Sequence, residues 1–270
     1  EYVDFYLLHG LDAERWAKLT DMKVLEWLTR KKEEGKIKHL AFSFHDEYAA
    51  FKKIIDDYDG WTMCQIHYNY VDSHYQAGTR GLKYAASKGL AVVIMEPIAG
   101  GRLATTPPPE IQAIWDKAEK KKKPAEWALQ WVWNQPEVSV VLSGMSTMDQ
   151  VKENVRSAGR SGPGSLTEKE LKIINLVAKK YAQFGYVGCT GCRYCQPCPE
   201  GVNIPTIISL YNEYFMKDRN DEIKKKYWEH ITPESQAKRC ARCGKCEEVC
   251  PQKLPERDII NRAAWLFEQT

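Results

Sequence analysis

Short apolar segments recur along the first part of the chain, separated by more polar stretches. They are Val3–Leu8, His39–Ser43, Met63–His67, Leu90–Met95 and Val138–Leu142. All five are short and rich in β-branched or aromatic residues, which is typical of strands that are buried on both faces. The pattern therefore predicts five buried strands.

Amphipathic patterns with helical spacing lie between and after these strands. The expected helices cover Asp21–Glu34, Tyr48–Tyr58, Arg80–Lys88, Glu110–Lys120, Pro124–Asn134 and Thr147–Ser157. Gly35 and Gly89 follow two of them, as is common where a helix ends. Alternating strands and helices indicate an α/β fold with a parallel sheet, either open or closed into a barrel.

The glycine- and serine-rich stretch Ser157–Ser165 separates this pattern from a different one. After it, Thr167 and Glu170 have the spacing of a capping box, and further helices are expected at about 205–230 and 256–268. A chain of 270 residues is long enough for one large domain and a smaller one. We therefore predict a first domain over 1–160 and a mostly helical second domain over 161–270.

Eight of the nine cysteines lie in two short runs of the second domain. These eight, the candidate metal ligands, are Cys189, Cys192, Cys195, Cys198, Cys240, Cys243, Cys246 and Cys250. The second run matches C-x2-C-x2-C-x3-C-P, an iron–sulfur spacing of bacterial ferredoxins. We interpret the runs as the ligands of two 4Fe–4S clusters.

Disulfides and zinc are the alternatives for these cysteines. Disulfides predominate in small, cysteine-dense secreted domains, whereas the first 188 residues here contain only Cys64. Zinc usually takes two ligand pairs separated by a longer loop. Four closely spaced cysteines, twice, fit a cluster better. The clusters would either stabilise a small helical domain or transfer electrons, and the sequence leaves both roles open.

In two-cluster ferredoxins, the fourth cysteine of each run binds the other cluster. Applied here, one set is Cys189, Cys192, Cys195 and Cys250, and the other is Cys240, Cys243, Cys246 and Cys198. The first run departs from the ferredoxin spacing, because only Gln196 and Pro197 precede its fourth cysteine.

Composition argues against several classes of partner. The net charge is +3 and no basic stripe stands out, so nucleic acid is not an expected partner. No apolar stretch approaches the ~20 residues of a membrane span. Because oxygen degrades thiolate-bound clusters, we expect a reducing cytoplasm. The chain begins with Glu1 inside a strand, which leads us to expect an N-terminally truncated protein.

The ordered segments resemble the aldo-keto reductase family, in the branch that carries a C-terminal ferredoxin-like domain. YVDFYLLHG, IKHLAFSFH, CQIHYNY, VVIMEPIAGGRL and VSVVLSGMSTMDQVKEN are similar to that family's fourth to eighth strands and the loops after them. The resemblance implies a (β/α)8 TIM barrel, here lacking its first three strands, followed by a small, mostly α ferredoxin-like iron–sulfur domain. It also implies a nicotinamide cofactor, NADP or NAD, and hydride exchange with a small carbonyl or alcohol substrate.

The resemblance assigns roles to residues at the ends of these strands. His9 would orient or polarise the substrate carbonyl, and Ser43 and Gln65 would hydrogen-bond the nicotinamide carboxamide. The remaining cofactor-binding positions would be Met95, Pro97, Ile98, Gly100, Ser143, Gly144, Met145, Ser146, Gln150 and Asn154. Barrels often hold phosphate in the loops after strands seven and eight, where this chain has the Ala99–Gly101 loop and Ser146, a candidate N-cap for the helix from Thr147.

Several positions depart from the family pattern. Phe44 stands where an asparagine is common, and Met95 where many members stack an aromatic ring on the nicotinamide. Gly144 and Gln150 replace a lysine and an arginine of some members, so the choice between NADP and NAD stays open. These differences motivate an alternative function, an electron-transfer or docking iron–sulfur protein on a non-catalytic barrel.

The family's proton-donating tyrosine, with its lysine and aspartate, would precede the first residue of this chain. We therefore expect these 270 residues alone to be inactive in carbonyl reduction. A redox partner protein is also expected, because clusters carry single electrons whereas hydride carries two, and no flavin motif is visible in the sequence.

Overall fold

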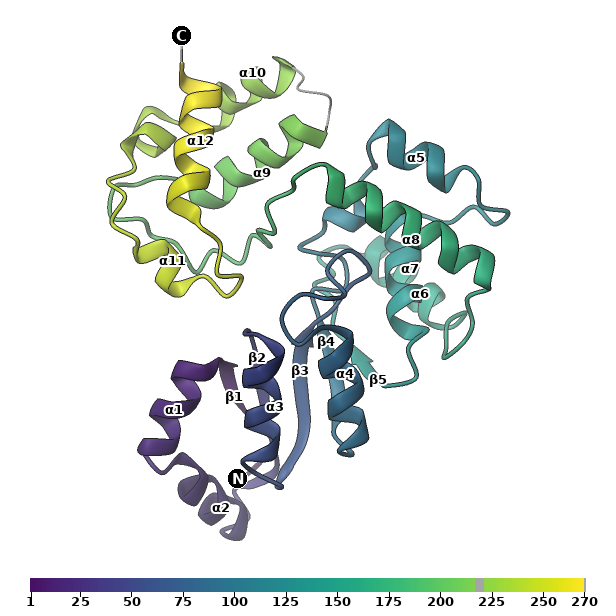
Figure 1. Ribbon diagram of the computed structural model, residues 1–270, viewed down its shortest axis with the longest axis vertical. Coiled ribbons are helices and arrows are strands. Elements are labelled where there is room, and N and C mark those ends of the chain that lie inside the picture. The colour runs from purple at the N-terminus through teal and green to yellow at the C-terminus, as the bar shows by residue number, and fades with distance from the viewer. Residues whose placement is uncertain (217–220, 270) are drawn as a thin grey trace. The chain divides into compact units, whose positions relative to one another are not determined.

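The computed structural model describes residues 1–216 and 221–269. Contacts divide the chain into two compact units (Figure 1). The first comprises Glu1–Ile98, Leu103–Thr105 and Lys120–Asn175, and the second comprises Ala99–Arg102, Thr106–Glu119 and Leu176–Thr270. The predicted domain boundary near residue 160 stays a prediction.

A parallel sheet of five strands forms the centre of the first unit, as the apolar segments predict. The strands are β1 (Val3–Leu11), β2 (Ile37–Phe44), β3 (Trp61–His67), β4 (Ala91–Met95) and β5 (Val138–Val141). They lie in the order β1-β2-β3-β4-β5, and every neighbouring pair is parallel. Within the described residues this sheet is open, so closure into a barrel stays a prediction.

Burial differs between the inner and the edge strands. Phe42 on β2 and Ile94 on β4 are fully buried, as expected for strands covered on both faces. Phe5 on β1 is 49% exposed and Val140 on β5 is also 49% exposed, so the prediction of two buried faces is wrong at these positions. An edge strand has a neighbour on one side alone, and its apolar side chains lack part of their cover.

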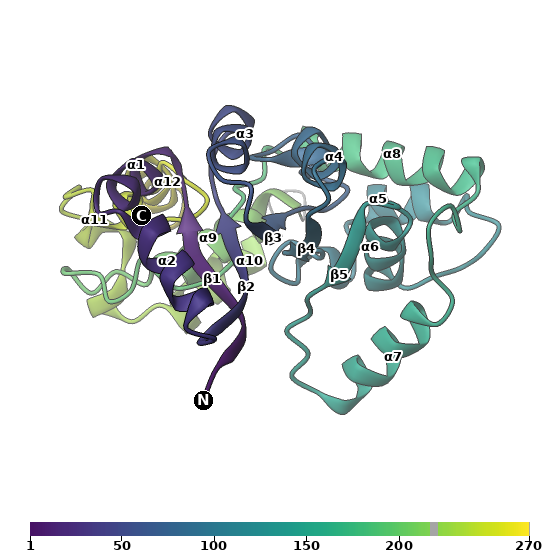
Figure 2. The ribbon, with the colours of Figure 1, turned by 90° about the horizontal axis from the view of Figure 1, so that it is seen from below.

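Helices connect successive strands of the first unit, and one further helix, α7, follows the last strand. They are α1 (Ala13–Asp21), α2 (Val24–Glu33), α3 (Tyr48–Asp56), α4 (Gly78–Ser87), α6 (Pro124–Trp133) and α7 (Met148–Ala158). Figure 2 shows α3 and α4 side by side on one face of the sheet. Phe51 of α3 attaches this layer to the sheet, because its ring packs edge-on against Phe44 of β2 at a centroid distance of 5.0 Å.

The start of the first predicted helix was wrong. The pattern placed it at Asp21, where α1 in fact ends, and α2 begins at Val24 after Lys23 adopts a left-handed conformation with φ 58°. The short helix α1 was not among the predicted helices, and Trp16 is its one buried residue. Its start is fixed by the Asp12 side chain, which accepts a hydrogen bond from the Arg15 amide at 2.7 Å.

Short helices and long irregular segments make up most of the second unit. The helices are α5 (Pro109–Trp115), α9 (Ile204–Met216), α10 (Asp221–His230), α11 (Lys245–Val249) and α12 (Glu256–Glu268), with 3₁₀ turns η1 (Arg102–Ala104, shared between the units), η2 (Pro233–Ser235) and η3 (Ala237–Arg239). Helix α8 (Glu168–Gln183) begins in the first unit and ends in the second.

The apolar core of the second unit lies among α9, α10 and α12. Tyr227 of α10 is fully buried and stacks on Phe267 of α12 at a centroid distance of 4.7 Å. Five of the cysteines are partly buried against this core: Cys189, Cys195, Cys198, Cys240 and Cys246. The core therefore positions the two cysteine runs.

Candidate functional site

The carboxyl ends of β1 to β4 gather four of the predicted cofactor and substrate residues in pairs. Ser43 Oγ accepts a hydrogen bond from the Gly10 amide at 2.7 Å and lies 3.5 Å from His9 Nδ1. On the neighbouring strands, the Gln65 side-chain amide donates to the Met95 sulfur at 3.4 Å. Ser43 and Gln65 are also register partners of β2 and β3, so the strand pairing itself aligns them.

Two histidines to which sequence reasoning gave no role lie at or just after the ends of the same strands. His45 and His67 follow Ser43 and Gln65 by two residues, and His67 lies on the same strand face as Gln65. That two-residue spacing is the signal that could have identified them. His67 is 2% exposed, and its Nε2 lies 3.3 Å from Asp72 Oδ2.

His45 is kept uncharged by its surroundings. Burial lowers the pKa of His45 to about 4, against the effect of a hydrogen bond with Gln76, and the nearby charges of His67, His9 and Arg15 lower it further. At the carboxyl edge of the sheet, His45 and His67 each present a buried ring nitrogen, Nδ1, without a hydrogen-bond partner among the described residues.

The loop after β5 pairs four more predicted cofactor residues with one another. Asn154 donates to Ser143 Oγ at 3.0 Å, and the Gln150 side chain accepts from the Ser146 amide at 2.8 Å. The N-cap of α7 is Thr147, so the prediction of Ser146 was wrong. Gln150 explains the difference, because its amide and side chain form a capping box with Thr147. Gly144 has open space around it, and Met145 is 39% exposed.

The glycine loop after β4 lies against protein backbone. Pro97 is buried and Ile98 is partly buried, and the chain then turns at Gly100 with φ +65°. A Cβ atom on Gly100 would lie 2.7 Å from the Thr190 carbonyl oxygen, closer than real Cβ atoms approach. The close approach that this glycine permits here is therefore to the segment between Cys189 and Cys192.

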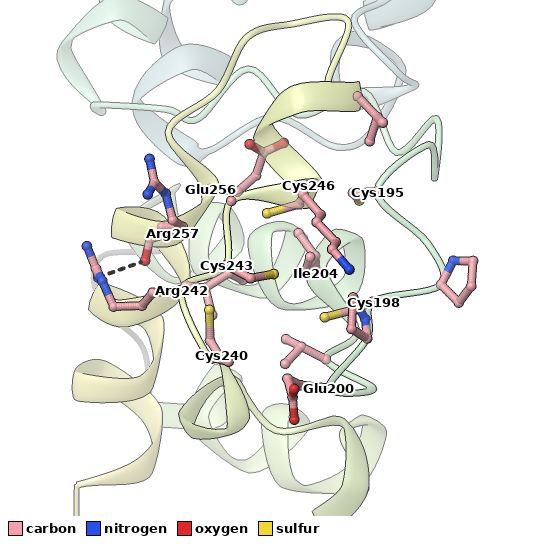
Figure 3. Close-up of a pocket in the computed structure, with 18 of the residues that line it drawn as sticks. Cys195, Cys198, Glu200, Ile204, Cys240, Arg242, Cys243, Cys246, Glu256 and Arg257 are labelled. Carbon is pink, nitrogen blue, oxygen red and sulfur yellow. Dashed lines mark hydrogen bonds between the residues drawn. The ribbon is translucent and has the colours of Figure 1, made fainter.

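Two cavities of the second unit collect the eight clustered cysteines. The larger cavity, of about 170 Å³, is lined by Cys198, Cys240, Cys243 and Cys246. In Figure 3 their sulfur atoms point toward a common centre. A smaller cavity of about 20 Å³ is lined by Cys189, Cys192, Cys195 and Cys250. The four cysteines named for each cavity comprise three from one run and one from the other, and Cys195, named for the smaller cavity, lines the larger one as well.

The walls of the two cavities share a buried carboxyl group. Cys195, Ile204 and Glu256 line both cavities. Glu256 is 2% exposed, and its Oε2 atom has no hydrogen-bond partner among the described residues. Burial raises the pKa of Glu256, although the Cys250 thiol opposes this shift by donating to it. Sequence reasoning missed this residue, because an acidic side chain at the start of a helix is usually exposed.

The chemistry of the cysteines fits iron–sulfur clusters better than the alternatives. All nine cysteines are free thiols. Four closely spaced cysteines, present twice, differ from the two separated ligand pairs that zinc usually takes. Burial raises the pKa of Cys195 and of Cys250 to about 12, and a bound cluster would supply the positive charge that stabilises the thiolates.

Comparison with protein families matches both parts of the chain. The aldo/keto reductase family matches residues 1–175, and a 4Fe-4S dicluster domain matches residues 188–254. Within the part that the structure describes, no helix combines the length and the apolar character that a membrane crossing requires.

Individual relatives are distant. L-galactose dehydrogenase of Arabidopsis thaliana is 29% identical over 171 residues, which cover 57% of this chain and 52% of that protein. An uncharacterized oxidoreductase of Schizosaccharomyces pombe is 26% identical over 157 residues, which cover 58% of this chain and 47% of that protein. This chain therefore spans about half the length of the curated relatives it matches.

Solved structures show the same fold. The holo form of an aldo-keto reductase from Bacillus halodurans has a TM-score of 0.51 and 24% identity, covering 65% of this chain and 61% of that one. Since the family match extends over more than half of the sequence, this chain belongs to the aldo/keto reductase family and carries a 4Fe–4S domain behind the family's segment.

Proposed function

We propose that the protein is an NAD(P)H-dependent oxidoreductase that interconverts a small carbonyl compound and its alcohol, with two 4Fe–4S clusters in the second unit. The observation that carries this proposal is the pairing of His9 with Ser43 beside the Gln65–Met95 pair. These four side chains come from four adjacent strands and meet at the edge where parallel α/β folds bind ligands.

Each residue has a defined task in this proposal. Ser43 already accepts the Gly10 amide, so its own hydroxyl proton is available to a carboxamide oxygen. The Gln65 amide, held by Met95, offers a second polar contact to the same group. His9 donates a hydrogen bond to the substrate oxygen and so polarises the carbonyl. The nicotinamide, when bound, supplies or accepts the hydride.

The cysteines would hold the clusters in the two sets that line the cavities. Cys240, Cys243, Cys246 and Cys198 hold one cluster, and Cys189, Cys192, Cys195 and Cys250 hold the other. The clusters supply single-electron chemistry, which we propose is exchanged with a redox partner protein. We further propose that these 270 residues alone do not turn over carbonyls, because five strand ends provide only part of a site that a barrel surrounds with eight.

A second candidate function is electron transfer or docking without hydride chemistry. One predicted cofactor position favours it, because the Gln150 side chain is engaged in the cap of α7. In this case the sheet would act as a scaffold and the second unit would carry the activity.

Cofactor titration separates the two functions. Anaerobically purified protein is titrated with NADPH and with NADH, and cofactor fluorescence is followed. We expect saturable binding that weakens about tenfold or more in Ser43→Ala, a loss of about 1.4 kcal/mol that is typical of one removed hydrogen bond. Binding of neither cofactor would overturn the first function and favour the second. Saturable binding that Ser43→Ala leaves unchanged would reject the assigned contact.

A further inference from the structure

The segment between the first two cysteines makes an unusually close backbone contact. A Cβ atom placed on Gly100 would lie 2.7 Å from the Thr190 oxygen, 2.9 Å from its Cα and 3.0 Å from its carbonyl carbon. Gly100 and Thr190 belong to the same compact unit, although 89 residues lie between them. Any residue larger than glycine at position 100 would therefore displace the backbone of Thr190 or of the loop itself.

A second contact joins the same two segments. Arg102 is 9% exposed, and its guanidinium lies 3.2 Å from the ring centroid of Tyr186. The Tyr186 hydroxyl donates a hydrogen bond to the Cys189 carbonyl at 3.4 Å. Arg102 thus anchors the loop on a tyrosine that in turn contacts the backbone of a cluster ligand.

The cysteine segment itself is an irregular loop. Residues 186–193 form neither helix nor strand. The Asn212 side chain holds Val187 through two hydrogen bonds of 2.9 Å, one to its amide and one to its carbonyl. Beyond that point Cys189 and Cys192 flank Thr190, so cluster ligation would fix the chain on both sides of the residue that Gly100 contacts.

We propose that this contact couples cluster retention to nicotinamide binding. With the cluster in place, the Cys189–Cys192 segment holds the Ala99–Arg102 loop, which continues directly from β4, in its cofactor-binding conformation. When the cluster is lost, the segment and the loop are both released. The proposal rests on the proposed function, in which this loop contacts the cofactor.

The coupling must act in both directions. If the cluster-bound form favours the cofactor, the bound cofactor favours retention of the cluster by the same factor. Couplings between sites are typically about 5- to 150-fold. A protein with this device binds its nicotinamide well only while its cluster is intact, so damage to the cluster reduces cofactor binding without any change at His9 or Ser43.

The experiment measures cluster loss in the full chain. Cluster-loaded protein is mixed anaerobically with an iron chelator, and bleaching of the cluster absorbance is timed with and without saturating NADPH. We expect NADPH to slow the loss from wild-type protein about fivefold or more. Gly100→Ala should lose its cluster faster than wild type without cofactor, and NADPH should no longer protect it.

Gly101→Ala is the matched control for the measurement of cluster loss without NADPH. Gly101 also has a positive φ, of +95°, so alanine strains its backbone as well. A Cβ atom at position 101, however, would have no heavy atom of the described residues within 4 Å beyond its chain neighbours. We expect Gly101→Ala to lose its cluster at the wild-type rate. Equal rates in the two variants would overturn the role of the Thr190 contact, and thermal unfolding of both variants identifies a general folding defect.

The outcomes also separate this proposal from the function on which it rests. Fluorescence titration of the same samples reports whether NADPH binds at all. Binding without protection of the cluster overturns the coupling and leaves the proposed function standing. If NADPH does not bind, the proposed function is overturned, and the proposed coupling is overturned as well. Protection that persists in Gly100→Ala overturns the route through Thr190.

Discussion

The two units of the molecule are stabilised by different means. In the first unit, strands β2 to β4 carry fully buried side chains such as Leu40, Phe42 and Ile66, and polar groups collect at one edge of the sheet. In the second unit, a small core of helices supports two largely irregular segments, and six of their eight cysteines are partly buried. The first unit gains its stability from apolar burial, whereas the loops of the second require an added ligand.

Because of this difference, we expect the two units to respond differently to the loss of iron. We expect a sheet with a continuous apolar core not to depend on iron, and we expect the segments that carry the clustered thiols to depend on it. Burial raises the pKa of Cys246 to about 11, so without a cluster this group is a partly buried, neutral thiol that lines a cavity of about 170 Å³. An emptied cavity of that kind loses packing as well as ligation.

Iron removal should therefore produce the largest difference between the units. We expect a chelator to abolish cooperative unfolding of the second unit, a loss of about 5 kcal/mol or more, which is the stability of a whole small domain. Hydrogen exchange followed by mass spectrometry should show faster exchange in α9 and α12 after chelation. Strands β2 and β3 should keep their protection, because their hydrogen bonds lie in the apolar unit.

The comparison fails if both units respond alike. Loss of protection in β2 and β3 together with α9 would mean that the clusters stabilise the entire chain. Unchanged protection in α9 would mean that the apolar core around Tyr227 is sufficient by itself. Reconstitution with iron and sulfide is the control, and it should restore the slow exchange of α9 and α12.

A smaller difference should appear on acidification, at His45 in the first unit. The pKa of His45 is about 4 in the folded protein and ~6.5 in an unfolded chain. Between these values the unfolded chain binds a proton that the folded chain does not, so stability falls as the pH drops from ~6.5 toward 4. The shift from 6.5 to about 4 corresponds to about 3 kcal/mol in total.

Urea unfolding of wild type and His45→Gln at neutral and acidic pH isolates this contribution. Glutamine keeps polar contacts but does not titrate, so the variant should lose about 3 kcal/mol less than wild type over this range. Carboxyl groups that titrate near pH 4 are shared by both proteins and cancel in the difference. Identical pH slopes would show that His45 is not held neutral by the fold.

Local sequence patterns predicted where the strands lie in the chain, but not which strands would lie at the edges of the sheet. All five apolar runs became strands because β-branched and aromatic content marks a strand locally. The exposure of Phe5 and Val140 depends on which strand lies alongside, and that information is not local. Helix α1 was missed although its N-cap, Asp12, is a local signal for the start of a helix.

The candidate sites likewise combine features that a local sequence pattern predicts with features that depend on distant parts of the chain. The ferredoxin spacing identified the eight clustered cysteines, because ligand spacing within a run is a local property, whereas the division of these cysteines into two cluster sites stays a prediction. The contact of Gly100 with Thr190 and the proximity of His45 to His9 join distant parts of the chain, and no single segment encodes them. Glu256 shows the same limit, since only the packed fold reveals that this carboxyl is buried.

The smallest predicted effect concerns Gln150, whose side chain has a structural role and a proposed binding role. In the structure it accepts from the Ser146 amide, while the Gln150 amide donates to Thr147 Oγ1 at 3.3 Å. Thr147→Ala and Gln150→Ala each remove one half of this capping box and should each cost about 1 kcal/mol in urea unfolding. If Gln150 contributes to NADPH binding only by capping α7, both variants should bind NADPH with the same affinity. A markedly weaker affinity in Gln150→Ala than in Thr147→Ala would show that the glutamine contacts the cofactor directly. The difference between the two variants therefore measures the binding role, because the loss of the cap is common to both.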